Sequence, residues 1–142
     1  MAELAEIREF FKGDRYATEA TGIIIEKAEK GHSEVSLIPD ERHLNAVGAL
    51  MGAVYCTMAD FAFAVAENCD LSSDTVTVTQ STQMNFLRAY KGGKISCRAD
   101  IVKDGRNICL YEVKAYGENG DLLAMAVTNG CKTKKDDRRM RR

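Results

Sequence analysis

The sequence lacks an excess of charge of either sign. Its 20 basic and 21 acidic residues give a formal net charge of −1. No overall electrostatic field therefore favours nucleic acid or an anionic membrane surface, and we expect neither as a partner.

The cysteines lack the pattern of a disulfide framework or a zinc site. There are five of them, an odd number, and no two have Cys-x-x-Cys spacing. We therefore expect reduced thiols that serve mostly as small core residues, with no bound metal.

Long apolar runs are also absent. The most apolar stretch is interrupted by Asp60 and Glu67, which excludes a membrane-spanning helix. The first fifteen residues contain acids from the start and no apolar segment of signal-peptide length. We expect a cytoplasmic protein that makes no membrane contact.

The length and the hydrophobic content of the sequence are sufficient for one domain. Its 142 residues, 45% of them hydrophobic, can bury a core without disulfides or metal. We treat residues 1–142 as a single domain. Leu4 and Ile7 stand at helical spacing in an N-terminal helix at about 2–13, and a charged tail occupies about 133–142.

The longest apolar run, from His43 to Asn68, predicts a central helix. Large apolar residues recur in it at every third or fourth position, and alanines occupy much of the remaining surface. A helix that is hydrophobic nearly all round should be buried. Asp60 lies inside this run and is the carboxylate whose presence needs an explanation.

The other segments predict antiparallel strands. Residues 22–38 form an expected hairpin that Pro39 ends. Alternating segments separated by glycine-containing turns follow the helix at 75–90, 95–101, 109–115 and 122–128. Three hairpin connections in a row predict a meander. Because a sheet must wrap so apolar a helix, we expect an α+β hotdog fold, a curved antiparallel sheet around a long central helix.

The central run also carries a motif. Asn45-x-x-Gly48-x-x-Met51-Gly52-Ala53, followed by Thr57-Met58-Ala59-Asp60, resembles the hotdog acyl-CoA thioesterases of the PaaI type. That family usually has Asn-x-x-Gly-x-x-His-Gly-Gly and then an Asp at the same spacing. The resemblance covers about residues 20–132. Two positions depart from it, since Met51 replaces the usual His and Ala53 replaces the second Gly.

The resemblance implies an enzyme that hydrolyses a thioester. This reaction needs a donor for the developing oxyanion and a base or nucleophile. The Gly52 backbone N–H, in the first turn of the helix, would polarise the thioester carbonyl. Asp60 would act as general base or nucleophile. The substrate would be a small aromatic or medium-chain acyl-CoA, so coenzyme A is part of the substrate and no cofactor is expected.

Helix geometry adds a constraint on this site. Gly52 and Asp60 are eight positions apart, which is about 12 Å along a helix axis. Both groups cannot touch one carbonyl within one helix. The site must therefore combine Gly52 of one subunit with Asp60 of another, in agreement with the dimers of the family. We expect a homodimer or a homotetramer built as a dimer of dimers.

The resemblance assigns further roles. Asn45 would position the substrate carbonyl or the water, although it could equally be a loop or helix-capping residue. Ser81 would orient the attacking water, with Thr82 as the alternative. Met51 and Ala53 would contact the substrate. The cationic candidates for the phosphates of coenzyme A are Arg88, Lys94, Lys103 and Arg106.

A second function from a different class stays open. A non-catalytic acyl-CoA-binding or sensor protein could keep the fold and lose activity through Met51. A hotdog dehydratase or hydratase is disfavoured, because such enzymes need a His–acid pair and neither His32 nor His43 falls within the predicted helix.

Overall fold

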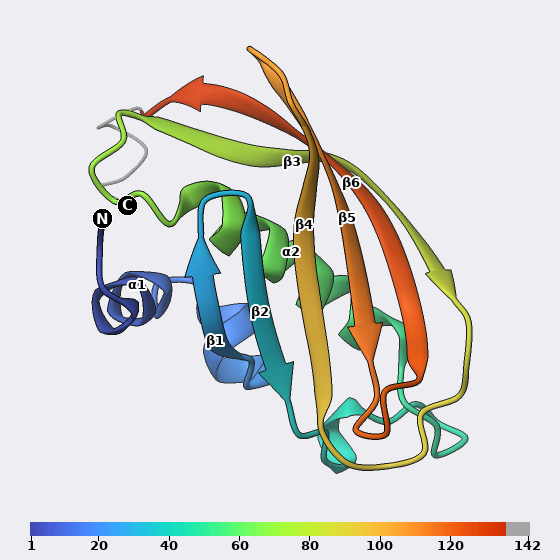
Figure 1. Ribbon diagram of the computed structural model, residues 1–142. Helices are drawn as coiled ribbons and strands as arrows, with labels where there is room; N and C mark the ends of the chain where they lie inside the picture. Colours follow the sequence, from blue (N-terminus) through green and yellow to red (C-terminus); the bar gives the residue numbers. More distant parts are fainter. Residues whose placement is uncertain (136–142) are drawn as a thin grey trace.

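A six-stranded antiparallel sheet curves around a long helix in the computed structural model, which describes residues 1–135 (Figure 1). The helices are α1 (Leu4–Phe11), the π-helix η1 (Tyr16–Thr21), the 3-10 helix η2 (Glu41–His43) and α2 (Gly52–Asn68). The strands are β1 (Ile24–Glu29), β2 (His32–Leu37), β3 (Thr75–Phe86), β4 (Ile95–Asp104), β5 (Ile108–Tyr116) and β6 (Leu122–Lys134). The predicted hotdog fold is confirmed.

Helix α2 fills the concave side of the sheet, as its composition predicts (Figure 1). Met58, Phe63 and Val65 are fully buried, and the core continues into the inward residues of the strands. One stripe is the exception, because Ala53 and Asp60 are exposed. Within residues 1–135, no helix is both long and apolar enough to span a bilayer.

The helix begins later than the apolar run. Residues 41–43 form η2, and a short antiparallel bridge between Leu44 and Leu50 closes a loop in front of α2. The N-cap residue of α2 is Met51, which has extended backbone angles and provides no side-chain cap. Gly52 is therefore the first helical residue, so its N–H belongs to the unpaired first turn.

The strand order β1-β2-β4-β5-β6-β3 corrects one part of the prediction. Strands β4, β5 and β6 form the expected meander of adjacent hairpins. Strand β3 does not pair with β4. It pairs with β6, whereas β4 pairs with β2. The first of the three predicted hairpins, that between β3 and β4, is therefore wrong. Its connection, residues 87–94, is longer than the usual hairpin loop of two to about five residues.

The two ends of the described chain were predicted unequally well. Helix α1 lies within the predicted 2–13, and it buries Ile7 and Phe11. The predicted tail at 133–142 is wrong at its start, since β6 continues to Lys134 and Thr133 pairs with Val76. The remainder of that predicted tail, 136–142, lies outside the described residues.

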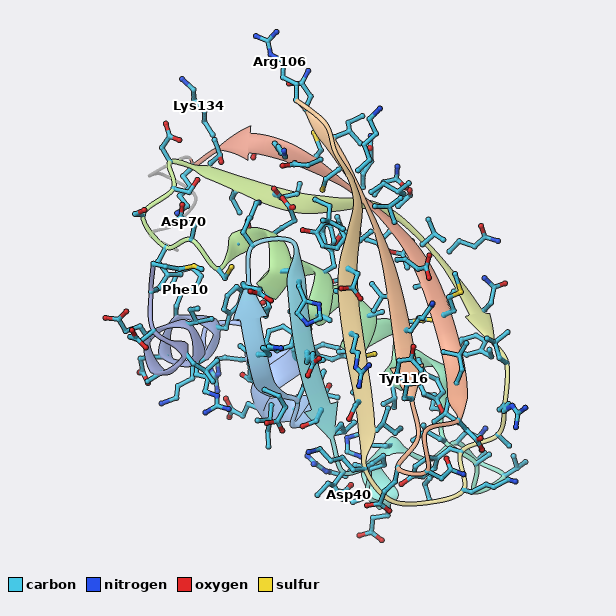
Figure 2. The ribbon with its side chains drawn as sticks, viewed as in Figure 1. Phe10, Asp40, Asp70, Arg106, Tyr116 and Lys134 are labelled. Atoms are coloured by element: carbon cyan, nitrogen blue, oxygen red, sulfur yellow. The ribbon has the colours of Figure 1, made fainter. Side chains whose placement is uncertain are left out.

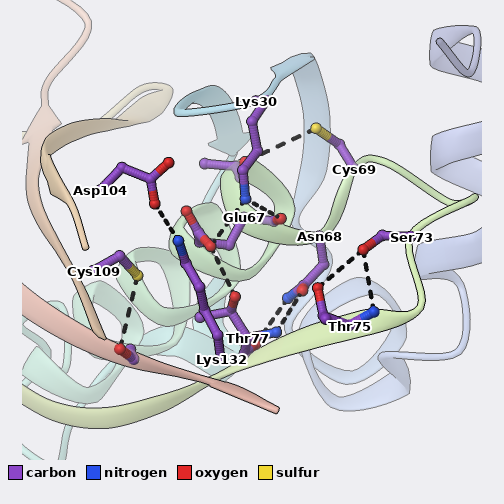
Figure 3. A network of polar contacts seen from close by, with 12 residues as sticks. Lys30, Glu67, Asn68, Cys69, Ser73, Thr75, Thr77, Asp104, Cys109 and Lys132 are labelled. Atoms are coloured by element: carbon purple, nitrogen blue, oxygen red, sulfur yellow. Dashed lines mark hydrogen bonds and ion pairs between the residues drawn. The ribbon is translucent and has the colours of Figure 1, made fainter. Parts of the chain in front are cut away.

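The last turn of α2 holds a buried carboxylate that the sequence pattern did not single out. The Glu67 side chain is 0% exposed. It accepts a hydrogen bond of 2.6 Å from the Tyr111 hydroxyl. It also accepts hydrogen bonds from the Thr77 hydroxyl at 2.8 Å and the Lys30 ammonium at 3.0 Å (Figure 3). These donors come from β5, β3 and the β1–β2 turn, so Glu67 ties the end of α2 to three parts of the sheet.

The hydrogen bonds decide the charge of Glu67. Burial raises the pKa of its carboxyl, but the donors Tyr111, Thr77 and Lys30 outweigh burial and hold the pKa below the ordinary value. A group whose pKa is lower in the folded state stabilises the protein above its unfolded pKa. That contribution is lost as the pH falls through the folded pKa.

We predict that Glu67→Gln lowers the free energy of unfolding at pH 7 by about 1–3 kcal/mol, because hydrogen bonds to a charged acceptor are replaced by weaker ones. Urea unfolding measured between pH 7 and pH 3 should show the gap to the wild type narrowing below about pH 4.3, the ordinary glutamate pKa, because the unfolded chain then binds a proton that folded Glu67 does not. Glu29→Gln removes an exposed carboxylate from the β1–β2 hairpin, which also contains Lys30, and serves as the control. A Glu67→Gln protein as stable as the wild type at pH 7 would contradict the prediction.

Candidate active site

Asp60 lies on the exposed stripe of α2, next to the strand at the edge of the sheet. Its Oδ1 accepts a hydrogen bond of 2.6 Å from the hydroxyl of Thr79 on β3. Of the two carboxylates in the helix, Asp60 is the solvent-facing one and Glu67 is the buried one. One Asp60 oxygen is therefore fixed by protein, while solvent reaches the side chain.

A bulge in β3 decides which of its side chains face α2. Thr79 pairs with Gly130 and Ser81 pairs with Asn129, so Gln80 is an extra residue between them. A Cβ atom on Gly130 would collide with the Phe63 ring of α2, so this position faces the helix. Because paired residues share a face, Thr79 points toward α2.

The two hydroxyl residues predicted for the water lie on opposite faces of β3. Ser81 pairs with Asn129, on the face that points away from α2 in this chain. Thr82 pairs with Thr128 on the inner face, and their hydroxyl oxygens are 3.1 Å apart. Asp60 is therefore contacted by Thr79, a residue that the sequence motif did not indicate. Thr79 shares the inner face with Thr77, as alternation predicts, whereas the bulge after Thr79 turns Ser81 outward.

The beginning of α2 is accessible but narrow. Met51 and Ala53 are both exposed on either side of Gly52. A Cβ atom at Gly52 would come within 2.8 Å of Cζ of Phe86, whose ring lies over this position. Glycine at position 52 thus allows the Phe86 ring to pack against the start of the helix.

Asn45 organises the loop in front of α2. Its side-chain oxygen accepts hydrogen bonds from the N–H groups of Val47 at 3.1 Å and Ala49 at 3.0 Å. Gly48 in the same loop has a φ of +81°, a left-handed conformation that glycine adopts readily. The loop role considered for Asn45 is confirmed. Its amide N–H group takes no part in these bonds, and its role toward substrate stays a prediction.

The four cationic candidates do not gather in one chain. Arg88 and Lys94 belong to the β3–β4 connection and pair with Asp121 at 3.6 Å and Glu26 at 3.5 Å. Lys103 and Arg106 lie at the other end of β4, and Figure 2 shows Arg106 at the tip of the β4–β5 hairpin. The ten residues of β4 span about 33 Å, so the two pairs lie at opposite ends of the molecule.

Asp60 also borders a cavity that sequence reasoning missed. The cavity has a volume of about 480 Å³ and lies between residues 13–17 and α2. Asp14 and Tyr16 line it from the N-terminal side, and Thr57 and Phe61 line it from the helix. No sequence signal links residues 13–17 with Asp60, because the contact depends on how the N-terminal segment folds back.

Comparisons with known proteins agree with this geometry. The model of the thioesterase superfamily matches residues 47–124, which include Gly52, Asp60 and Thr79. A Deinococcus radiodurans protein named as an esterase is 32% identical over 109 residues, which are 75% of this chain and 72% of that protein. The 1,4-dihydroxy-2-naphthoyl-CoA hydrolase of Listeria monocytogenes is 25% identical over 108 residues, covering 76% and 88% of the two chains.

Solved structures share the fold. A mutant of the phenylacetic acid degradation protein PaaI from Thermus thermophilus superposes with a TM-score of 0.72 at 27% identity, covering 80% of this chain and 96% of that one. A hypothetical thioesterase from Streptococcus pneumoniae, solved with coenzyme A, gives a TM-score of 0.77 at 22% identity, covering 89% and 99%.

The curved antiparallel sheet around α2 and its solved neighbours define a hotdog-fold protein. The match of the family model to more than half of the sequence goes further: the chain belongs to the thioesterase superfamily. The predicted PaaI-like resemblance and the predicted thioester hydrolase are both confirmed at this level.

The contacts of Asn45 allow its two possible roles to be separated. Asn45→Asp keeps the oxygen that holds Val47 and Ala49 but removes the amide donor, whereas Asn45→Ala removes both. If the amide positions substrate, we expect Asn45→Asp to fold with wild-type thermal stability and to hydrolyse thioesters about tenfold more slowly. Melting temperature and kcat/KM are the measurements. An Asn45→Asp enzyme with wild-type kcat/KM would leave Asn45 with the loop role alone.

Proposed function

We propose that this thioesterase hydrolyses an acyl-CoA with a small aromatic or medium-chain acyl group, using Asp60 and the Gly52 N–H in a site shared by two subunits. The observation that carries the proposal is the exposed Asp60 carboxylate, held by Thr79 and two helical turns from the unpaired N–H groups at the start of α2.

Each group has one task in the reaction. An oxygen of Asp60 takes a proton from water while the water oxygen bonds to the thioester carbon. The Gly52 N–H stabilises the negative charge that develops on the carbonyl oxygen, assisted by the partial positive charge of the helix start. The carbon–sulfur bond then breaks and its electron pair leaves with the thiol sulfur, which receives the proton held by Asp60. The hydrogen bond from Thr79 fixes the plane of the Asp60 carboxylate during the attack.

The unpaired surfaces of the chain support a shared site. Gly52 and Asp60 lie at positions 1 and 9 of the same helix, about 12 Å apart along its axis. Beside them, among residues 1–135, β3 pairs with β6 and has no strand on its other side. The open edge of this twelve-residue strand, next to an exposed helix stripe, is a surface suited to a second copy of the chain.

The same arrangement accounts for the separated cations. A two-fold axis that pairs two β3 edges antiparallel would bring the β4–β5 hairpin end of one subunit toward the Arg88 end of the other. Two of the related proteins support coenzyme A as the thiol part, since one is named as a hydrolase of an acyl-CoA and one was solved with coenzyme A.

Met51 is the observation that favours the alternative, an acyl-CoA-binding protein without activity. It occupies the N-cap position beside Gly52, and its 47% exposed side chain offers no hydrogen-bond donor. The alternative and the proposed reaction differ in whether thiol is released.

We predict that Asp60→Ala lowers kcat for acyl-CoA hydrolysis about 10²–10⁴-fold, the usual contribution of a general base. Thiol release from a panel of aromatic and medium-chain acyl-CoAs measures this loss of kcat.

Thr79→Val should lower kcat about tenfold by freeing the Asp60 carboxylate. Ser81→Ala tests the role predicted for Ser81 in orienting the attacking water. Binding without thiol release by the wild type would support the sensor, and an active Asp60→Ala enzyme would refute the assigned base.

The shared site makes a separate prediction about mixed dimers. Asp60→Asn and Gly52→Val chains should each be inactive alone, the second because its side chain would collide with the Phe86 ring and disturb the start of α2. When the two are co-expressed, the mixed dimer contains one site with both native groups, so about a quarter of wild-type activity should return for random pairing. A mixture as inactive as its components would show that each site uses groups from one chain.

A further inference from the structure

The cavity beside Asp60 is enclosed by two elements of the same chain. Residues 13–17 form one wall, and α2 forms the other with Thr57, Asp60, Phe61 and Ala64. Its volume of about 480 Å³ lies in the range of pockets that hold small organic molecules. Residues 13–17 precede the segment that matches the family model, so this wall belongs to a part of the chain that the family pattern does not describe.

The N-terminal wall is held in place by contacts with the core. Before it, Phe11 packs edge-to-face on Phe61 of α2 with ring centroids 5.8 Å apart. After it, Ala17 is buried, and its carbonyl accepts hydrogen bonds from the N–H groups of Gly22 at 3.1 Å and Ile23 at 3.0 Å. The cavity is therefore largely formed before a ligand binds, as is usual for small-molecule sites.

Two of the hydrogen-bond donors around the cavity are already engaged within the protein. The Thr57 hydroxyl donates to the Ala53 carbonyl at 3.0 Å. The Arg15 guanidinium donates to the Glu19 carboxylate at 2.8 Å. A phosphate group binds through charge-assisted hydrogen bonds, so these side chains offer it little.

The carboxylates beside the cavity act in the same direction. Asp14 and Asp60 border it from opposite walls, and both would repel the anionic phosphates of coenzyme A. The cations considered for those phosphates belong to the β3–β4 connection and to the β4–β5 end of the sheet instead. Of the two halves of an acyl-CoA, the uncharged acyl group is the one that this cavity suits.

The lining of the cavity along α2 is apolar beyond Asp60. Phe61 is buried, and Ala64 lies one helical turn after Asp60 on the same face. These four residues rise about 6 Å along the helix axis, so a group attached to a carbonyl carbon beside Asp60 extends past the small Ala64 side chain. Tyr16 lines the opposite wall and is 71% exposed, so its ring is available for contact with a ligand.

We propose that the acyl group of the substrate occupies this cavity, that Ala64 limits its size, and that Tyr16 favours aromatic acyl groups by packing against them. The proposal rests on the proposed function, in which the thioester carbon lies beside Asp60. It goes further, because it assigns the acyl half of the substrate to the N-terminal segment and α2 of one subunit and names the residues that select among acyl groups.

The first test changes the size of the cavity. Ala64→Leu replaces a methyl side chain with an isobutyl one next to Asp60. We expect kcat/KM to fall at least about tenfold for benzoyl-CoA and octanoyl-CoA and to change less than about threefold for acetyl-CoA. Ala5→Leu makes the same substitution at an exposed position of α1 and should leave all three values unchanged. Equal losses for the three substrates in Ala64→Leu would overturn the assignment of Ala64.

The second test removes the aromatic side chain from the N-terminal wall. Tyr16→Ala should lower kcat/KM for benzoyl-CoA about three- to tenfold, the usual value of an aromatic pair, and should lower that for octanoyl-CoA less. Tyr16→Phe keeps the ring and should restore the benzoyl-CoA value. Tyr116→Ala removes a tyrosine that contacts the Arg98 guanidinium on the sheet and serves as the control. If Tyr16→Ala keeps the wild-type ratio of the two substrates, Tyr16 does not select aromatic groups.

Binding of S-benzyl-CoA tests the acyl site without turnover, because this thioether carries an aromatic group and cannot be hydrolysed as a thioester. By isothermal titration calorimetry, the wild type should bind it about tenfold more tightly than coenzyme A itself, owing to burial of the ring. Ala64→Leu should bind the two equally. Equal binding of both by the wild type would overturn the inference, whether or not thiol is released from acyl-CoAs. A wild type that prefers S-benzyl-CoA but releases no thiol would refute the proposed reaction and support the acyl site.

Discussion

The structure depends on the enclosure of one apolar helix. Helix α2 has buried residues on almost every side, and a helix of this kind is stable only when other elements cover it. The curved sheet and the N-terminal segment cover most of it in one chain. They leave the stripe that contains Ala53 and Asp60, which lies next to the unpaired edge of β3. The incomplete enclosure and the candidate active site therefore occur at the same place.

Features with a local cause could be predicted from the sequence. The apolar period of α2, the alternation in β4 to β6 and the spacing from Asn45 to Asp60 are all set within short segments. The pairing of β3 with β6 could not be predicted in this way, because it joins Thr75 to Lys134 across most of the domain. Neither could the length of β6, since residues 132–134 have the charged composition of a tail and become strand only by pairing with β3.

The candidate site likewise contains residues that could be predicted from a local pattern and others that could not. Gly52 and Asp60 were predictable because they lie on one helix at a fixed spacing. The outward position of Ser81 was not, because it depends on one inserted residue, Gln80, in β3. The cavity wall formed by residues 13–17 was not, because those residues reach Asp60 only when the N-terminal segment folds back onto α2. The surroundings of Asp60 thus depend on tertiary contacts, although Asp60 itself is part of a sequence motif.

The two carboxylates of α2 show how the fold assigns different work to similar groups. They are two helical turns apart, and both accept a hydrogen bond from a threonine of β3, Thr79 for Asp60 and Thr77 for Glu67. Glu67 has two further donors and no exposure, so its charge is fully engaged and can only stabilise the fold. Asp60 has one hydrogen-bonded oxygen, faces solvent and borders a cavity, so it remains accessible, as the role proposed for it requires. The number of donors around each carboxylate thus separates the one that ties the helix to the sheet from the one that stays accessible.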